Sequence, residues 1–259
     1  MQQPESTEKY GRRPGAREAI IKILRVLRLN RVAARLYYRY FHGFDSAEKD
    51  LPAFIHRCLR RAVESGIAGR GDYYEFGVFK GYTFWQAQLA ARELGIEQMR
   101  FFGFDSFEGL PQVHGVDDME DGPFYEGQFA WSLERVKKEL DKRGTDWERC
   151  SLIKGYFETT LSESTRSQYD MGKASVVMMD CDLYESASVA LEFLKDMLVD
   201  GAILIMDDWN AFDSDESRGE RLALAEFIQT NPNWVAEPWF EYGLYGQVFV
   251  MHRLGAVRT

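Results

Sequence analysis

The chain has 259 residues, of which 45% are hydrophobic and 28% charged, a globular composition with room for one large α/β domain or two small ones. Its formal net charge of −9 argues against a general nucleic-acid-binding protein, whose affinity comes from neutralising phosphates. No apolar run approaches the roughly 18–20 residues of a membrane span, and the polar first 19 residues contain no signal-peptide core, so we expect a cytoplasmic protein.

The first 66 residues divide into an arm and a helical region. Residues 1–16 contain two prolines and two glycines and predict a flexible arm. Helices are expected from Arg17, near Arg31–Tyr40 and at Pro52–Ser65. Residues 1–40 hold ten Lys and Arg against three Glu, a local net charge of +7. We expect residues 17–66 to form a helical cap that packs on the main domain or mediates homo-oligomerisation. Contact of the basic helix with a membrane surface is a less favoured alternative.

From Gly71 the pattern alternates between strands and helices, and residues 67–259 are expected to form one domain. Strands separated by helices of this kind predict right-handed crossovers and a mostly parallel sheet with helices on both faces. The last two strands should pair antiparallel across the turn region Glu241–Gly246. The expected strands are Tyr73–Phe76, Arg100–Phe104, Ser151–Lys154, Ser175–Met179, Ala202–Met206, Trp234–Glu237 and Val248–His252. The expected helices are Gly81–Leu94, Trp131–Arg143, Ser186–Leu198 and Arg218–Thr230, with a long loop at 106–130.

Carboxylates follow several of the expected strands. Asp105, Asp180, Asp207 and Asp208 come directly after strands, and Glu75 lies near the end of another. In parallel sheets the carboxyl ends of the strands meet at one edge, where ligands bind. These side chains are therefore expected to gather on one rim of the sheet.

The segment "YYEFGVFKGYTF" combines a strand, a turn with Gly77 and Gly81, and the start of a helix. Glycine lets the backbone approach a ligand, and a helix N-terminus offers free N–H groups. The G-x-G-x-x-G dinucleotide fingerprint is absent. Asp105, in "FFGFDSFEGLP", could bond the ribose of a nucleoside, or it could cap a helix together with Ser106. Nucleoside binding by itself does not separate a nicotinamide cofactor from S-adenosylmethionine, because both carry adenosine.

The segments "MDCDLYES" and "MDDWN" place acids in pairs, which repel one another unless a cation lies between them. Mg²⁺ prefers about six oxygen ligands, so carboxylates on adjacent strand ends would suit it. Zinc is disfavoured because no Cys and His set accompanies the acids, and the three cysteines have neither metal spacing nor a disulfide framework. The alternative is that these acids are helix caps and ion-pair partners on a solvated rim.

Five segments, in this order, resemble the macrocin/mycinamicin type of sugar O-methyltransferase: "EFGVFKG", "GFDSFEGLP", "KGYFETTL", "MDCDLYES" and "GAILIMDDW". The resemblance covers about residues 55–252. It implies a class I enzyme that uses S-adenosylmethionine and Mg²⁺, built on a Rossmann-like seven-stranded sheet with an antiparallel last strand. The acceptor would be a hydroxyl of a sugar or of a glycosylated natural product.

By position, the resemblance assigns Asp180, Asp207 and Asp208 as the metal ligands. It puts the residues of the glycine turn at the methionine side of the cofactor and the segment from Asp105 to Phe107 at its ribose and adenine end. The full cofactor-binding set that it implies is Glu75, Phe76, Gly77, Lys80, Gly81, Thr83, Asp105, Ser106, Phe107, Gly155, Tyr156, Phe157 and Asp180.

Methyl transfer to a hydroxyl needs alignment of the reacting atoms and a base for the proton. Asp180 is the first candidate for the base, followed by Asp182 and then by His114 in the long loop, where a lone histidine is more often a surface residue. Loop 106–130 exceeds normal connection lengths and carries several glycines and aromatic residues, which predicts a lid. The aromatic stretch Trp239–Gly246 could stack on a sugar or complete the core.

Three rival functions use the same features. An NAD-dependent oxidoreductase or epimerase is disfavoured by the missing third glycine and by the lack of a Tyr-x-x-x-Lys pair in a suitable helix. A metal-dependent phosphohydrolase could use clustered aspartates but would not need Glu75 and Asp105. A non-enzymatic scaffold could dock on membranes through the basic helix. The acceptor, the methylated position and the oligomeric state stay open.

Overall fold

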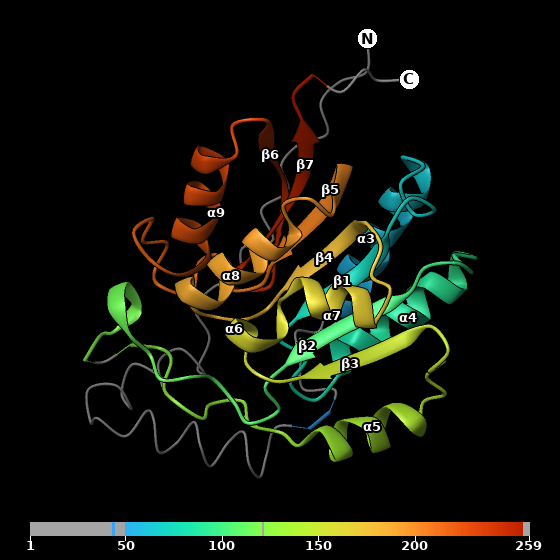
Figure 1. Cartoon of the computed structure of the whole chain (residues 1–259), viewed down its shortest axis with the longest axis horizontal. Coiled ribbons are helices and arrows are strands. Elements are labelled where there is room, and N and C mark those ends of the chain that lie inside the picture. The colour runs from blue at the N-terminus through green and yellow to red at the C-terminus, as the bar shows by residue number, and fades with distance from the viewer. Residues whose placement is uncertain (1–42, 45–49, 121, 256–259) are drawn as a thin grey trace.

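The structure is a computed structural model, and it describes residues 43–44, 50–120 and 122–255. The described part is built on one seven-stranded sheet of order β3-β2-β1-β4-β5-β7-β6 (Figure 1). β1 to β5 pair in parallel, and β7 runs antiparallel to both of its neighbours. This confirms the mostly parallel sheet with an antiparallel last strand. The strands are β1 (Asp72–Phe76), β2 (Phe101–Asp105), β3 (Cys150–Lys154), β4 (Ala174–Met179), β5 (Leu198–Met206), β6 (Trp234–Tyr242) and β7 (Gly246–Arg253).

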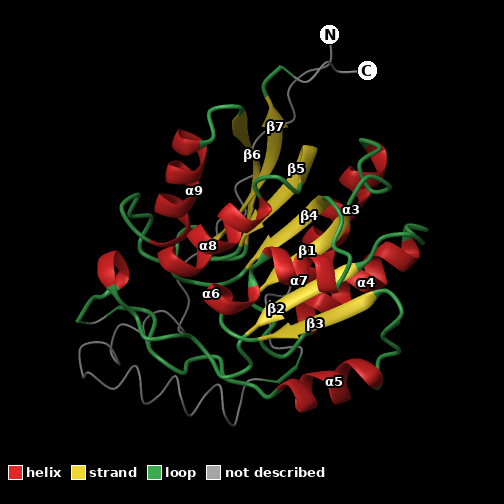
Figure 2. Cartoon of the chain, viewed as in Figure 1, coloured by secondary structure: helices red, strands yellow, loops and turns green. Residues whose placement is uncertain are grey.

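Helices cover both faces of the sheet (Figure 2). The α3–α4 pair lies on one face, and α6 to α9 lie on the other. α5 lies beside the N-terminus of α4, since a side chain on Gly81 would meet Val136 and Leu140 of α5. The helices are α3 (Leu51–Glu64), α4 (Tyr82–Glu93), α5 (Leu133–Asp141), α6 (Phe157–Thr160), α7 (Glu163–Gln168), α8 (Tyr184–Leu194) and α9 (Gly219–Thr230), with a 3₁₀ turn, η2, at Gly115–Asp117.

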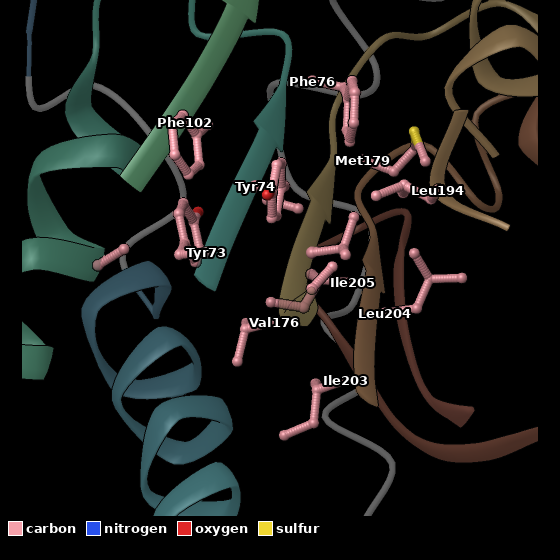
Figure 3. Packing of buried hydrophobic residues seen from close by; sticks show 14 of the residues in the cluster. Tyr73, Tyr74, Phe76, Phe102, Val176, Met179, Leu194, Ile203, Leu204 and Ile205 are labelled. Atoms are coloured by element: carbon pink, nitrogen blue, oxygen red, sulfur yellow. The ribbon is translucent and has the colours of Figure 1, made fainter. Parts of the chain in front are cut away.

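The core lies on both sides of the central strands (Figure 3). Every residue of β1 and of β4 is buried, as expected for strands covered by helices on both faces. Aromatic rings stack between neighbouring strands, with Tyr74 on Phe102 at 5.1 Å and Phe76 on Phe104 at 5.2 Å between ring centroids. This packed layer gives the strand ends a rigid base.

The residues before the sheet are described only in part. The predicted arm at 1–16 and the helices predicted between Arg17 and Tyr40 lie outside the described residues. The third predicted helix is α3, and its Ile55, Cys58 and Leu59 are fully buried in the core. α3 thus packs as a layer of the main domain. Among the residues that the structure describes, no helix is both long and apolar enough to cross a membrane.

The largest differences from the predicted limits lie around β5 and β6. The helix predicted at Ser186–Leu198 ends at Leu194, and β5 already begins at Leu198. The Asp200-Gly201 pair reads as a turn in the sequence, but in the structure it lies within β5. β6 continues past Pro238 to Tyr242, so much of the predicted turn region is strand. Proline is tolerated there because β6 is an edge strand. The short α6, α7 and η2 were not predicted, since they offer too few turns for periodicity.

Candidate active site

The predicted carboxylates do gather on one edge of the sheet. The backbone hydrogen bonding of the parallel strands continues past their ends: Asp180 N donates to Phe76 O at 2.8 Å, and Asp207 N donates to Met179 O at 2.9 Å. β1 and β4 are neighbours although they are far apart in the chain, so the strand order reverses between them. Ligands of open α/β sheets bind at such a reversal.

The glycine turn after β1 is pressed against the end of β4. Gly77 has φ +92°, and a Cβ atom on it would lie 1.7 Å from the carbonyl oxygen of Asp180. Gly81, with φ +86°, is the N-cap of α4. Both positions require glycine, because a side chain at Gly77 has no room and both φ values are left-handed. The turn therefore brings backbone N–H groups and the N-terminus of α4 to the rim.

Asp105 shapes this turn. One of its carboxylate oxygens accepts hydrogen bonds from the backbone N–H groups of Val78 and Phe79, each at 2.8 Å, and the other accepts from Phe107 N. Burial raises the pKa of Asp105, and the three backbone donors oppose that rise. No helix begins at Asp105, so the helix-cap alternative is wrong in its simple form. Ser106 bonds Gly109 O at 2.7 Å and turns the chain into the long loop.

Glu75 is fully buried beside the turn. Its Oε2 accepts the hydroxyl proton of Tyr73 at 2.6 Å, while its Oε1 has no hydrogen-bond partner among the described residues. Burial raises the pKa of Glu75 well above its usual range. A buried acceptor without a partner needs a reason, and an amino group of a bound ligand would supply the missing donor. This observation fits S-adenosylmethionine with its methionine end at Glu75.

The remaining predicted cofactor residues come from the segment after β3 and from around the start of α4. Gly155 N donates to Asp105 O at 3.0 Å, and Phe157 packs edge-on against Phe76 at 5.9 Å. Lys80 is buried, with its ammonium 4.5 Å from the ring centroid of Trp131, and burial lowers the pKa of that ammonium. Thr83 is buried in the first turn of α4, and Tyr156 is exposed.

Three carboxylates meet at the other side of the rim. Asp180, Asp207 and Asp208 each offer an oxygen, and these oxygens all lie within 4.8 Å of one another. Oxygens that share a Mg²⁺ at about 2.0–2.1 Å lie at most about 4.2 Å apart, so only a small side-chain adjustment would be needed for the three to share one ion. Burial, with the neighbouring carboxylates adding to it, raises the pKa of Asp180 and of Asp208 well above the usual range. The oxygen-only set fits a hard divalent cation.

Two further acids surround this cluster. Asp182 is buried with φ +66°, and its carboxyl group hydrogen-bonds to that of Asp208. Glu220 in the first turn of α9 is 1% exposed, and its Oε2 accepts from Asp208 N at 3.1 Å. Its Oε1 is without a partner among the described residues. The sequence analysis missed Glu220, because an acid in the first turn of a helix is an ordinary feature.

Tyr242 at the end of β6 also contacts the cluster, with its hydroxyl donating to Asp207 Oδ1 at 2.7 Å. The sequence analysis included it only as one member of an aromatic stretch. No local pattern distinguishes it from its neighbours, since its partner lies 35 residues away in the chain.

The long loop at 106–130 is fastened to the acidic half of the rim. Asp117 is 4% exposed, and its two carboxylate oxygens accept from Tyr184 N at 2.6 Å and Gly219 N at 2.9 Å, the first residues of α8 and α9. A small apolar cluster adds to this attachment; its members are Leu110, Phe124, Leu183 and Phe212. His114 is exposed just before η2. The structure thus does not bury His114 with the acids.

This fold and rim define a class. Seven strands in this order, with a glycine turn after β1, are the fold of class I methyltransferases. The solved structure of the O-methyltransferase NovP shares the fold with a TM-score of 0.68 and 19% sequence identity, covering 91% of this chain and 98% of that one.

The sequence identifies the family within that class. Residues 50–232 match the family model of macrocin O-methyltransferase (TylF), and the chain belongs to this family. It is 31% identical over 159 residues, 60% of this chain, to 8-demethyl-8-(2,3-dimethoxy-alpha-L-rhamnosyl)-tetracenomycin-C 4'-O-methyltransferase of Streptomyces olivaceus. It is 27% identical over 182 residues, 62% of this chain, to demethyldecarbamoylnovobiocin O-methyltransferase of Streptomyces niveus. The matches span 58% and 65% of those two proteins.

Proposed function

We propose that this protein is a Mg²⁺-dependent O-methyltransferase that moves a methyl group from S-adenosylmethionine to a hydroxyl of a sugar or of a glycosylated natural product. The observation that carries the proposal is the trio Asp180, Asp207 and Asp208, with one oxygen each within 4.8 Å, directly beside the glycine turn. The backbone contact between Gly77 and Asp180 brings the cofactor side and the cation side together.

The cofactor is assigned to the half of the rim formed by β1, β2 and β3. Glu75, Gly77 and Gly81 bind its methionine end, where Glu75 has an acceptor to spare. Asp105 orients the turn through its backbone hydrogen bonds. Its carboxylate oxygens have further lone pairs, and these accept from the ribose hydroxyls. Ser106, Phe107 and the segment 155–157 line the adenine end, and Phe76, Lys80 and Thr83 support the turn from β1 and α4.

The chemistry is an in-line displacement, so most of the acceleration comes from positioning. The bound cation supplies a lower pKa and a fixed orientation to the acceptor hydroxyl. As the new O–C bond forms and the S–C bond breaks, the hydroxyl proton goes to a carboxylate. Asp180 is the base we assign, because it lies between the glycine turn and Asp207. Asp182 is engaged with Asp208, and His114 is exposed, so both rank below it.

The acceptor side is assigned to the β6–β7 turn and the attached loop. Within the stretch 239–246, Trp239 and Phe240 contact Arg57 of α3, at 4.9 and 4.1 Å from its guanidinium carbon. Leu244 and Tyr245 are 43% and 45% exposed. Asn210 N donates to Tyr245 O at 3.0 Å, which ties this turn to the segment after Asp207. Exposed apolar groups beside the acids suit the sugar ring or its aglycone.

The test is to incubate the purified chain with S-adenosylmethionine and a panel of nucleotide sugars, glycosylated macrolides and other glycosides, with Mg²⁺ or with a chelator. We expect a methylated glycoside by mass spectrometry that requires the cation. Full turnover in the chelator would contradict the metal model. Membership of the macrocin O-methyltransferase family disfavours the NAD-dependent oxidoreductase. The homo-oligomer expected from the sequence is a separate proposal, which light scattering of the full chain tests.

A further inference from the structure

Tyr242, at the end of β6, reaches the acidic trio with a neutral side chain. It is 6% exposed, and its hydroxyl donates to Asp207 Oδ1 at 2.7 Å. A hydrogen bond to one oxygen fixes the plane of a carboxylate, which determines where both of its oxygens point. Groups that orient the ligands of a metal in this way contribute strongly to its affinity.

The ring of Tyr242 is itself held from two elements. Phe54 of α3 is 5% exposed and stacks on it, with 3.8 Å between ring centroids and 27° between the planes. Gly246, its cross-strand partner in β7, has no side chain, and a Cβ there would lie 2.3–2.5 Å from Tyr242 ring atoms. The bare backbone of Gly246 therefore leaves the space that the ring occupies, and Phe54 fills the space against it.

We propose that Tyr242 is a positioning residue that orients Asp207 for the cation, and that Phe54 and Gly246 hold its ring in the orientation that makes this possible. The inference rests on the proposed cation site. It also links α3, in the region before the sheet, to the acidic rim through a single stack and a single hydrogen bond.

The decisive variant is Tyr242→Phe, which removes the hydroxyl and keeps the ring. Calorimetric titration of the substrate-free protein with MgCl₂ should give a Kd raised by about 10-fold or more. Turnover should fall at low Mg²⁺ and recover as Mg²⁺ approaches saturation. Tyr74→Phe is the matched control, since Tyr74 is a buried tyrosine of the same sheet whose hydroxyl donates to Gly172 O at 2.9 Å. Its Mg²⁺ affinity should equal that of the wild type.

The role of Phe54 is tested by a double-mutant cycle. Phe54→Leu should weaken Mg²⁺ binding by a few-fold in the wild type and have no further effect in Tyr242→Phe, because it acts through the ring. An equal loss in both backgrounds would overturn the part assigned to Phe54. Gly246→Ala should reproduce the Tyr242→Phe affinity; if it does not fold, the Tyr242→Phe titration still decides.

Asp207→Ala separates this inference from the proposed function. If Asp207→Ala abolishes Mg²⁺ binding and Tyr242→Phe binds Mg²⁺ like the wild type, the positioning role is wrong and the cation site stands. If Asp207→Ala itself binds Mg²⁺ like the wild type, the proposed cation site fails, and the inference fails with it.

Discussion

The two halves of the rim use the same residue type at the same position and give it opposite surroundings. Asp105 ends β2 and accepts three backbone N–H hydrogen bonds. Asp180 and Asp207 follow β4 and β5 and face each other and Asp208. A position directly after a strand brings an acid to the rim, and the groups that contact its carboxylate determine its role. Peptide donors satisfy a carboxylate with hydrogen bonds, whereas neighbouring carboxylates repel it, and that repulsion would be relieved by a cation.

The largest effect should come from removing a charge on the acidic half. Asp207→Asn should lower turnover by on the order of 100-fold or more, because the site loses a charged ligand. The same change should raise the Tm of the cation-free protein, since it relieves repulsion among partly buried acids. Assays and thermal melts, with and without Mg²⁺, measure both. A lower Tm without the cation would break the comparison.

The opposite result is expected on the other half. Asp105→Asn loses hydrogen bonds from backbone N–H groups, because an amide nitrogen cannot accept them, and should cost about 3 kcal/mol of unfolding free energy. The KM for S-adenosylmethionine should rise as the turn loosens. Urea denaturation measures the cost. Asp215→Asn is the control: this exposed carboxylate accepts from Ser217 and pairs with Arg218, and its loss should lower the unfolding free energy much less than Asp105→Asn does. A stable Asp105→Asn would contradict the structural role.

The pH dependence sharpens the same contrast. Burial and like charges hold the pKa of Asp180 and Asp208 well above the unfolded-chain value, so the folded state binds protons that the unfolded chain has released. The destabilising contribution of these two carboxyl groups is therefore absent below an ordinary carboxyl pKa of about 4, and it grows as pH rises toward their folded-state pKa. Without divalent cation, Tm should therefore fall as pH rises above an ordinary carboxyl pKa, and saturating Mg²⁺ should remove most of that fall. An unchanged slope in Asp207→Asn would count against this origin.

Asp117 belongs to the acidic half but has peptide partners, so it should behave like Asp105. Asp117→Ala removes the acceptor for the first N–H groups of α8 and α9 and should cost about 2 kcal/mol. Ser162→Ala is the matched control, because Ser162 caps the single helix α7, and it should cost about 1 kcal/mol. Equal costs in chemical denaturation would contradict the double attachment.

The smallest predicted effect is a change in the KM of the acceptor alone. Tyr245→Ala should raise the acceptor KM several-fold and leave the KM for S-adenosylmethionine unchanged, because the β6–β7 turn adjoins the acidic half. Val235→Ala, at an exposed residue near the other end of β6, should alter neither constant. A change in the cofactor KM alone would reverse the assignment of the two halves.

The sequence predicts the rim well because strand ends are local signals. A buried strand followed by an acid can be recognised within ten residues, and the parallel sheet brings such ends together. Partners are different: Tyr242 meets Asp207 across 35 residues, and Asp117 meets Tyr184 and Gly219 across 67 and 102. No periodicity encodes these contacts, which depend on how separate elements pack. The same limit explains why β5 begins at Leu198, earlier than predicted: pairing with Ala174 of β4 extends the strand through a local turn signal.

The contact between Gly77 and Asp180 has a consequence for how the family can diversify. Main-chain atoms, rather than side chains, set the spacing between the half of the rim proposed for the cofactor and the half proposed for the acceptor. Substitutions on the β6–β7 turn or in loop 106–130 can therefore alter which molecule is methylated while the distance that the methyl group travels stays constant.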